Sequence, residues 1–587
     1  MSEIENAVKL KPSQLKPWLK YFPEESIGKP FTEVSLYQYL KDVSKDYYDC
    51  PAIDYYGTKF TFGGLVKSVD AAAAAYVKMG VKKGDIVSYL TITIPEVEMS
   101  LYALNKIGAV SNFIDPRMDV QRIADAVNST NSRFLLPLDI TWPKVEKVME
   151  ISSVEKVVIL QPSNFLPFPL KTLKNLKDKS STPKIPYDEN VMTWNKFIEN
   201  GRGTQAEQYY FEKGEMAIIT YTSGTTGTPK GVMITNEGMN AVVDSFHNCS
   251  TEWKLGCRFL DIMPVFASYG VVCGIHMPMA LHLENVIIPK LDPDKMGYLM
   301  KKYKPVSLMG VPAYYEKLMN SKEMVDFDLS FLSTCGCGGD RINSELQRQI
   351  NSFLKSHHAK FPLSQGYGMS ELSSAATCCF RFFTKEDSAG FPMLCSTVGI
   401  FDPETGEELD FDQQGEVCVT GPAIMKGYYG MPEETAHVLR VHEDGKTWVH
   451  TGDVGFMDED GFLFIRGRIK QLIIRFDGHK LAPVLIEKVI NEHNEVAICA
   501  VIGVKDPDHM QGHCPIGIIE LKDKNATDED KARIRREVLK LCDEVCEERG
   551  RPADVTFIDE MPHTSMGKHD YLALERMFKD FVINKEH

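Results

Sequence analysis

The residues whose types and spacing most clearly suggest a chemical role lie in one stretch, 222–231. It reads Thr-Ser-Gly-Thr-Thr-Gly-Thr-Pro-Lys-Gly. Glycines let a backbone approach a ligand closely, hydroxyls donate hydrogen bonds, and the lysine supplies a positive charge. This combination suits a polyphosphate, whereas a flexible hairpin loop, the alternative, has no need of so many hydroxyls before Pro-Lys-Gly. Apolar runs at 216–221 and 232–234 flank the stretch, so we expect a loop between two strands. The candidate phosphate-binding residues are Thr222, Ser223, Gly224, Thr225, Thr226, Gly227 and Lys230.

This stretch is not the usual P-loop, which requires Gly, four residues and then Gly-Lys-Ser/Thr between a strand and a helix. The one Gly-Lys-Thr in the sequence begins at Gly445, and Arg440 stands where the first glycine would be needed. No Gly-x-Gly-x-x-Gly follows a predicted strand, and neither His-Glu-x-x-His nor Gly-x-Ser-x-Gly occurs. The motifs of dinucleotide-binding folds, zinc proteases and serine hydrolases are therefore missing from the sequence.

Size and composition predict an ordinary globular protein of more than one domain. The chain has 587 residues and a net charge of −15, which argues against nucleic acid as a main partner but not against a small anion held by local lysines. The N-terminus lacks the apolar core of a signal peptide, and no apolar stretch approaches about 18 residues. We therefore expect a cytoplasmic protein without a transmembrane segment, whose 14 scattered cysteines are reduced and buried.

The order of predicted elements indicates an α/β fold. Strand-like runs alternate with helical patterns through the first 340 residues, as in 85–90 followed by 96–107 and 286–288 followed by 294–303. This alternation predicts β-sheets covered by helices. Between about 395 and 468 the pattern changes to short strands separated by Gly, Asp and Pro turns, which predicts a small antiparallel or barrel-like part.

The last block of the chain predicts a small α+β domain of its own. It contains a helix after Pro483, strands at 496–504, 516–521 and 555–558, and an amphipathic helix at 529–549 that we expect Gly550 to cap. We place the boundary near Lys470, which gives an N-terminal domain of residues 1–469 and a C-terminal domain of residues 470–587.

Two glycine-containing segments could approach a nucleotide. Residues 365–371 read Gln-Gly-Tyr-Gly-Met-Ser-Glu, in which the ring of Tyr367 could stack on a purine and the carboxylate of Glu371 could hold Mg²⁺. A plain turn, with Ser370 capping the next helix, is the alternative. Upstream, Gly338 and Gly339 could let a base approach the backbone or could form only a tight turn.

Three charged residues elsewhere in the sequence could contribute to the same nucleotide site. Asp453 follows a strand-like run and is either a turn residue or an acceptor for both hydroxyls of a ribose. Arg468 follows fifteen positions later and could add a donor. Lys568 lies on a loop containing Ser and Gly; a lone lysine of this kind is usually solvated.

Taken in this order, the segments resemble the adenylate-forming enzyme superfamily, which comprises acyl- and aryl-CoA synthetases, luciferases and peptide-synthetase adenylation domains. The resemblance runs from about residue 60 to residue 570. Residues 222–231 match the family phosphate loop almost letter for letter, and 367–371 match its Tyr-Gly-x-Thr-Glu motif with Ser370 in place of Thr. The remaining matches are Thr451-Gly452-Asp453, Gly467-Arg468, residues 421–429 and residues 562–568.

The resemblance implies a two-step reaction. A carboxylate first attacks the α-phosphorus of MgATP to give an acyl-adenylate and pyrophosphate, and a thiol then displaces AMP. It also implies a mobile C-terminal domain with its hinge at Lys470, and places ATP beside the phosphate loop, Gly338, Gly339 and residues 367–370, which are Tyr367, Gly368, Met369 and Ser370. The implied roles are phosphate binding for Thr226 and Lys230, Mg²⁺ binding for Glu371, ribose binding for Asp453 and Arg468, and bridging of the carboxylate and α-phosphate for Lys568.

The segment expected to line the acid pocket departs from the family pattern. Ala267 stands where a His often follows Pro-x-Phe, so an aromatic gate is altered or is supplied by Phe266 or Tyr269. One additional residue between Arg468 and Gly478 leaves open which backbone groups of 475–479 meet the thiol. The expected pocket residues are Phe266, Ala267, Tyr269 and Gly270.

The pocket residues suit an apolar acid, either fatty or aromatic, and of these two we expect a fatty acid as the substrate. The pocket segment lacks the Asp with which amino-acid-activating members hold an amine, and no carrier-domain serine motif follows it. We therefore expect a free-standing ligase that uses ATP, Mg²⁺ and coenzyme A, with an aryl acid or a carrier-protein thiol as the alternatives. A non-enzymatic nucleotide-binding protein and an oxidase of luciferase type are less favoured, and a homodimer is compatible with the sequence.

Overall fold

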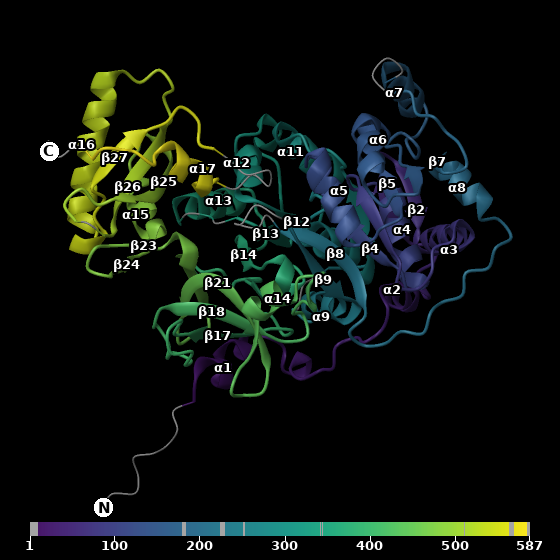
Figure 1. The fold of residues 1–587 in the computed structure, drawn as a ribbon, viewed down its shortest axis with the longest axis horizontal. Helices are drawn as coiled ribbons and strands as arrows, with labels where there is room; N and C mark the ends of the chain where they lie inside the picture. Colours follow the sequence, from purple (N-terminus) through teal and green to yellow (C-terminus); the bar gives the residue numbers. More distant parts are fainter. Residues whose placement is uncertain are drawn as a thin grey trace, which may run out of the picture.

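The computed structural model describes residues 10–178, 183–222, 229–249, 253–340, 342, 344–509, 511–562 and 569–583. A large α/β part, drawn from purple to green, carries a smaller part, drawn in yellow, at one side (Figure 1). The predicted α/β class, with a barrel-like part and a small C-terminal domain, is confirmed. In the described ranges, no helix is both long enough and apolar enough to cross a bilayer.

The first sheet positions the predicted phosphate loop. Its strand order is β19-β9-β8-β4-β3-β5-β6-β7, and the pairs from β4 to β7 and between β4 and β8 are parallel. The bounds are β3 Ile86–Leu90, β4 Val110–Phe113, β5 Phe134–Pro137, β6 Lys156–Ile159, β7 Val191–Thr193, β8 Met216–Thr222, β9 Lys230–Thr235 and β19 Gly427–Tyr428. Strands β3 and β5 are buried along their whole length, because helices cover both faces of the sheet.

The second sheet carries the predicted nucleotide-contacting glycines. Its order is β16-β15-β14-β13-β12-β10-β11-β1-β2, parallel from β1 through β14 and antiparallel at both edges. The bounds are β1 Pro51–Tyr55, β2 Thr58–Thr61, β10 Arg258–Asp261, β11 Glu284–Ile287, β12 Ser307–Gly310, β13 Thr334–Cys337, β14 Ser364–Tyr367, β15 Thr377–Cys378 and β16 Phe391–Pro392.

The predicted barrel-like part is an antiparallel sheet of order β17-β18-β21-β20, with β22 also paired to β21. The bounds are β17 Thr397–Phe401, β18 Gly415–Thr420, β20 Leu439–Val441, β21 Thr447–Met457 and β22 Leu463–Arg468. Figure 1 shows this sheet in green below the two large sheets. It brings Asp453 and Arg468 together, because they are Cα partners across β21 and β22.

The helices of the large part fill the space beside and between the sheets. Buried apolar residues of α5 and α6 cover β5 and β6, whereas α4 contacts β4 of the first sheet and hydrogen-bonds β11 of the second. The bounds are α1 Pro12–Leu15, α2 Leu36–Ser44, α3 Phe62–Met79, α4 Pro95–Lys106, α5 Val120–Ser129, α6 Trp142–Ile151, α7 Leu170–Asp178, α8 Trp194–Asn200, α9 Asn236–His247, α10 Met277–Ala280, α11 Met296–Tyr303, α12 Pro312–Met319, α13 Ser344–Ser356 and α14 Pro432–Val438.

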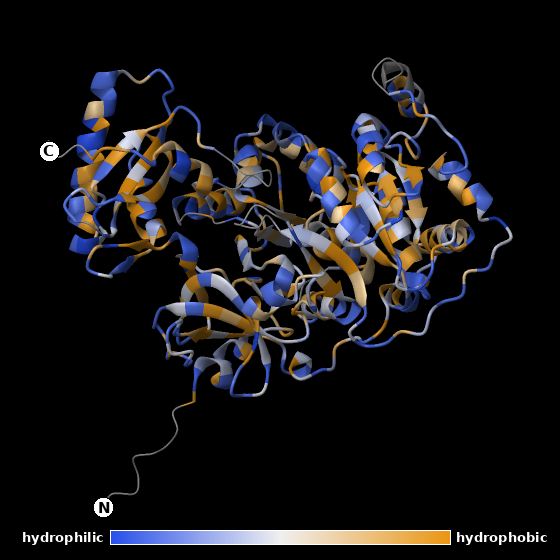
Figure 2. Cartoon of the chain, in the orientation of Figure 1, coloured by the Kyte–Doolittle hydropathy of each residue, from blue (hydrophilic) through white to orange (hydrophobic). Residues whose placement is uncertain are grey.

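The C-terminal part has its own sheet and core. Strands β25, β26 and β27 pair in that order, and a short pair of β23 and β24 precedes them. Figure 2 shows that apolar residues concentrate on these strands while much of α16 is hydrophilic. The bounds are β23 Ile473–Ile474, β24 Lys480–Leu481, α15 Pro483–Ile490, β25 Val496–Lys505, β26 His513–Leu521, α16 Asp528–Val545, β27 Asp554–Phe557 and α17 Tyr571–Met577.

One element of the C-terminal part ends earlier than the sequence predicts. Helix α16 stops at Val545 with Cys546 in an extended conformation, and Gly550 ends a separate 3₁₀ turn, Glu548–Gly550. Capping of this helix by Gly550 is therefore wrong. The buried face of the helix ends at Cys542, and the Glu-Glu-Arg sequence that follows Cys546 offers no apolar residue to continue the packing.

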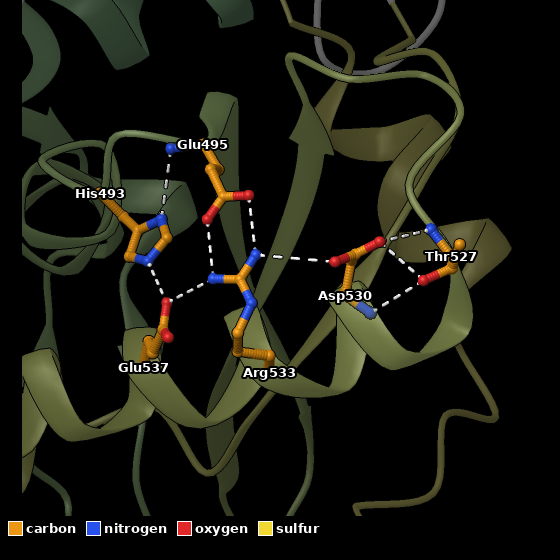
Figure 3. A network of polar contacts seen from close by, with 6 residues as sticks. All are labelled: His493, Glu495, Thr527, Asp530, Arg533 and Glu537. Atoms are coloured by element: carbon orange, nitrogen blue, oxygen red, sulfur yellow. Dashed lines mark hydrogen bonds and ion pairs between the residues drawn. The ribbon is translucent and has the colours of Figure 1, made fainter.

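A charged network ties α16 to the turn that precedes β25 (Figure 3). The guanidinium of Arg533 donates to both carboxylate oxygens of Glu495, each at 2.8 Å, and to Glu537 at 2.9 Å. His493 bonds the same Glu537 carboxylate at 3.0 Å, and Thr527 and Asp530 form a capping box. His493, Glu495 and Glu537 are close enough to share a metal ion, but Arg533 already hydrogen-bonds to both carboxylates.

Among the described residues, ion pairs link the C-terminal part to the large part at Lys488 and Lys480. Lys488 of α15 contacts Asp387 at 2.5 Å, and Lys480 of β24 contacts Glu404 at 2.8 Å. Both pairs are partly or largely solvent-exposed, so each contributes little to stability. They favour the present arrangement of the two parts without fixing it.

A buried carboxyl on α4 gives stability an expected pH dependence. Glu98 has no exposed surface and accepts a hydrogen bond from Asn285 of β11 at 2.8 Å. Burial, reinforced by the negative charge of Asp261, raises the pKa of Glu98 well above its usual value. The folded state therefore holds a proton that the unfolded state has lost, and stability falls as pH rises above the unfolded pKa.

Replacing Glu98 with glutamine is expected to remove this loss. The melting temperature of Glu98→Gln should exceed that of the unsubstituted protein by about 2–4 °C at pH 8 and should match it near pH 4.5. Thermal unfolding at the two pH values measures the difference, with the exposed Glu146→Gln of α6 as the control. An equal shift at both pH values would show that packing, not ionisation, is responsible.

Candidate active site

The predicted phosphate loop joins two paired strands, as expected. Strands β8 and β9 are antiparallel neighbours, and Thr222 at the end of β8 is the Cα partner of Lys230 at the start of β9. The central residues Ser223, Gly224, Thr225, Thr226, Gly227 and Thr228 lie outside the described residues. The structure therefore fixes the two ends of the loop and the position of its lysine.

Lys230 lies in a largely enclosed position beside acidic and aromatic groups. Its side chain is 18% exposed and forms an ion pair with Glu434 of α14. The ammonium lies 5.1 Å from the centroid of the Tyr428 ring, on β19, within cation–π range. Tyr428 is next to Lys230 because β19 pairs with β9.

Glu371 follows β14 by way of a turn that requires glycine. A Cβ at Gly368 would lie 1.9 Å from the carbonyl oxygen of Ser374, so no larger residue fits there. Glu371 is the middle residue of a short 3₁₀ turn, Ser370–Leu372. The N-cap of this turn is Met369, which makes no side-chain cap, so the alternative in which Ser370 caps a helix is wrong. The Ser370 hydroxyl instead lies 3.1 Å from that of Ser268.

One of the two carboxylate oxygens of Glu371 has a hydrogen-bond partner and the other has none. The hydroxyl of Tyr428 donates to its Oε1 at 2.7 Å, and its Oε2 is buried without a hydrogen-bond partner. Burial raises the pKa of Glu371, and the Tyr428 hydrogen bond opposes that rise. A buried carboxylate oxygen without a partner is the kind of ligand that Mg²⁺ takes, so the site fits this metal.

Asp453 joins the same site through two contacts. Arg468 Nε lies 2.8 Å from Asp453 Oδ1, and the Tyr367 hydroxyl donates to Oδ2 at 2.5 Å. The negative charge of Asp453 raises the pKa of Arg468, and burial, with Asp453 adding to it, raises the pKa of Tyr367 well above its usual value. Electrostatic interaction also links Arg468 with Glu371, so the predicted ribose and metal groups share one site.

Replacing Asp453 with alanine is expected to weaken AMP binding by about 10- to 10²-fold, the usual cost of losing charged hydrogen bonds. Calorimetric titration of the folded variant with AMP measures the effect. Asp458→Ala, in the turn after β21, removes a carboxylate that pairs with Lys385 instead and serves as the control. Unchanged AMP affinity in a folded Asp453→Ala protein would rule out the ribose role.

The predicted acid-pocket segment runs from β10 into a wide helical turn, Gly270–His276. Phe266 is buried, and the guanidinium of Arg117 lies 4.8 Å from its ring centroid. A Cβ at Gly270 would lie 2.1 Å from the Pro264 carbonyl oxygen, so the segment turns only with glycine there. Ala267 and Tyr269 are half-buried beside it.

This segment contacts the predicted adenine side through Tyr269. Its hydroxyl would lie 3.9 Å from a Cβ at Gly338, and Gly339 has a φ of +78° that favours glycine. Gly338 and Gly339 thus lie just after β13, which pairs with β14, and Gly338 lies near Tyr269 and the Gly366 carbonyl oxygen. The structure brings the acid-pocket segment and residues 367–371 together.

Several residues that complete the site were not predicted from the sequence. Tyr428 appeared there only as part of the 421–429 segment, and Glu434 and Arg117 carried no signal. Glu416 was also missed. It accepts a hydrogen bond from the Gly452 backbone at 3.1 Å and bonds His450 at 2.8 Å, which braces the backbone of β21 before Asp453. With Cys418 it could hold a metal, although these hydrogen bonds already occupy it.

The predicted hinge, Lys470, lies within the described residues, whereas the predicted bridging lysine, Lys568, does not. Lys470 lies in the 3₁₀ turn Ile469–Gln471, which directly follows Arg468 and leads into the C-terminal part. Lys568 lies outside the described residues. Its role and that of the hinge remain predictions.

Comparison with known proteins agrees with this arrangement. A model of the AMP-binding enzyme family matches residues 40–429, and a model of the AMP-binding enzyme C-terminal domain matches residues 485–568. The chain is 30% identical to a long-chain-fatty-acid–CoA ligase of Bacillus subtilis, covering 94% of this chain and 96% of that protein. It is 27% identical to a probable 4-coumarate–CoA ligase 1 of Dictyostelium discoideum, covering 88% and 89%.

The solved structure of ATP-bound MatB from Rhodopseudomonas palustris has the same fold. It superposes with a TM-score of 0.78 at 23% identity, covering 94% of this chain and 99% of that one. With the matches to both domain models, the fold and the site place this chain in the family of AMP-binding enzymes.

Proposed function

We propose that this chain is an ATP-dependent, AMP-forming acyl-CoA ligase that activates a fatty acid as its acyl-adenylate and transfers the acyl group to coenzyme A. The observation that carries the proposal is the convergence of Lys230, Glu371, Asp453 and Arg468 on one site, with a buried Glu371 oxygen that lacks a partner. Such a set can hold phosphates, a divalent cation and a ribose together.

In this proposal the protein acts mainly by position and charge. Asp453 accepts the ribose hydroxyls with Arg468 beside it, and the ring of Tyr367 stacks on adenine. Lys230 and the loop that precedes it hold the β- and γ-phosphates. Glu371 would hold Mg²⁺, which would neutralise phosphate charge, and Lys568 would bridge the carboxylate and the α-phosphate.

The choice of a fatty acid rests on the apolar surroundings of the pocket segment and on the relatives. Phe266 and Tyr269 contribute aromatic rings to the pocket segment. Among the described residues, Arg117 is the charged side chain that lies over the Phe266 ring, and its charge is paired with Asp115 at 2.8 Å. A hydrocarbon tail suits such apolar rings.

An AMP-release assay over a panel of carboxylic acids tests the function. Fatty acids of increasing length, cinnamic-type aryl acids and short dicarboxylic acids are each incubated with MgATP, with and without coenzyme A. AMP and acyl-CoA formation with fatty acids is expected. Preferential use of aryl acids would support the alternative substrate class, and no AMP with any acid would refute the ligase. A cytoplasmic location and a homodimer remain predictions.

A further inference from the structure

The ion pair between Lys230 and Glu434 joins the proposed phosphate site to a helix that carries no proposed catalytic residue. The Lys230 side chain is largely enclosed, whereas Glu434, on the first turn of α14, is 46% exposed. The two residues are 204 positions apart and meet because β19, which precedes α14, pairs with β9. Glu434 therefore occupies the side of Lys230 on which an anion is stabilised.

The remaining contacts of Lys230 do not depend on Glu434. The ring of Tyr428 lies 5.1 Å from the ammonium and is itself fixed by the hydrogen bond from its hydroxyl to Glu371. Lys230 also begins β9, opposite Thr222, so its backbone is held by the sheet. These contacts can keep Lys230 in place when its carboxylate partner is exchanged for another anion.

Other basic residues also interact electrostatically with the Glu434 carboxylate. The pKa of Glu434 is lowered, first by its contact with Lys230 and then by His437 of its own helix and Lys470 of the following turn. The carboxylate thus stays charged and interacts with Lys470 as well as with Lys230. It can leave Lys230 without losing all electrostatic stabilisation.

We propose that Glu434 is an internal competitor for the nucleotide phosphates: its carboxylate holds Lys230 before ATP binds, yields to the β- and γ-phosphates, and takes Lys230 back when pyrophosphate leaves. The inference rests on the proposed function, because it treats Lys230 as a phosphate-binding lysine. Its consequence is weaker binding of ATP and faster release of pyrophosphate than the lysine alone would give.

Binding measurements on the full chain, without turnover, test the competition. Calorimetric titrations with ATP, pyrophosphate and AMP are compared for the unsubstituted protein, Glu434→Gln and the adjacent Glu433→Gln. Because it removes the competing charge, Glu434→Gln is expected to bind ATP and pyrophosphate about two- to fivefold more tightly, as for a partly exposed ion pair. AMP, which lacks the β- and γ-phosphates, should bind equally to all three proteins, and Glu433→Gln should match the unsubstituted protein.

The outcomes separate the inference from the function on which it rests. Weaker or unchanged binding of ATP by a folded Glu434→Gln overturns the competition; a loss would show that Glu434 orients Lys230 instead. An equal gain for AMP also overturns it, because that gain could not come from phosphates at Lys230. If the unsubstituted protein binds neither ATP nor AMP, the proposed ligase function fails as well.

Discussion

Replacing Lys568 with alanine is expected to slow acyl-adenylate formation about 10²–10³-fold, the usual cost of removing one preorganised charge donor from a transition state. In the proposed reaction negative charge gathers between the attacking carboxylate and the α-phosphate. Lys230 is committed to the far phosphates in that proposal, and Arg468 is paired with Asp453 at 2.8 Å. Neither can supply a second positive charge at the reacting carboxylate.

The two half-reactions distinguish this role from general damage to the fold. Adenylation is measured by acid-dependent exchange of pyrophosphate into ATP, and the thiol step by conversion of supplied acyl-adenylate to acyl-CoA. Lys568→Ala should lose the first and retain the second. Lys579→Ala, an exposed lysine beyond α17, is the control for charge on the terminal segment. Equal loss in both half-reactions would refute the bridging role.

The sequence predicted the parts of this site that are local. The strands on both sides of residues 223–228 follow from two apolar runs, and Asp453 and Arg468 lie on neighbouring strands of a hairpin that short-range turn signals already indicate. Gly368 could be recognised within its motif, although the reason for it, a carbonyl oxygen 1.9 Å from any Cβ, is visible only in the structure. Each of these depends on residues close in sequence.

The parts that could not be predicted depend on pairing over long distances. Tyr428 reaches Glu371 and Lys230 only because a two-residue strand, β19, adds to the edge of the first sheet. So short a strand has no periodicity to detect. Glu434 follows this strand, in the first turn of α14. An acidic residue at the start of a solvated helix is common, so its type and position gave no sign of a contact with Lys230. The misplaced end of α16 has a similar cause, since tertiary packing ended the helix before its glycine.

Replacing Lys470 with proline is expected to slow the thiol step by about 10²-fold, the scale of effect that follows from misplacing a reacting group by about 1 Å. Adenylation should change far less. Lys470 lies in the 3₁₀ turn between β22 and the C-terminal part, where a swing of that part would require new backbone angles. Proline fixes φ near −65° and restricts the residue before it, so one arrangement is retained at the expense of the other.

The contacts between the two parts make such a swing feasible. Among the described residues, the ion pairs that span them include Lys488 with Asp387 and Lys480 with Glu404, which are partly or largely exposed and so cost little to break. Lys470→Ala, which loses the charge but keeps backbone freedom, is the matched control and should retain the thiol step. An unchanged yield of acyl-CoA from supplied acyl-adenylate in Lys470→Pro would show that the turn at 469–471 is not the hinge.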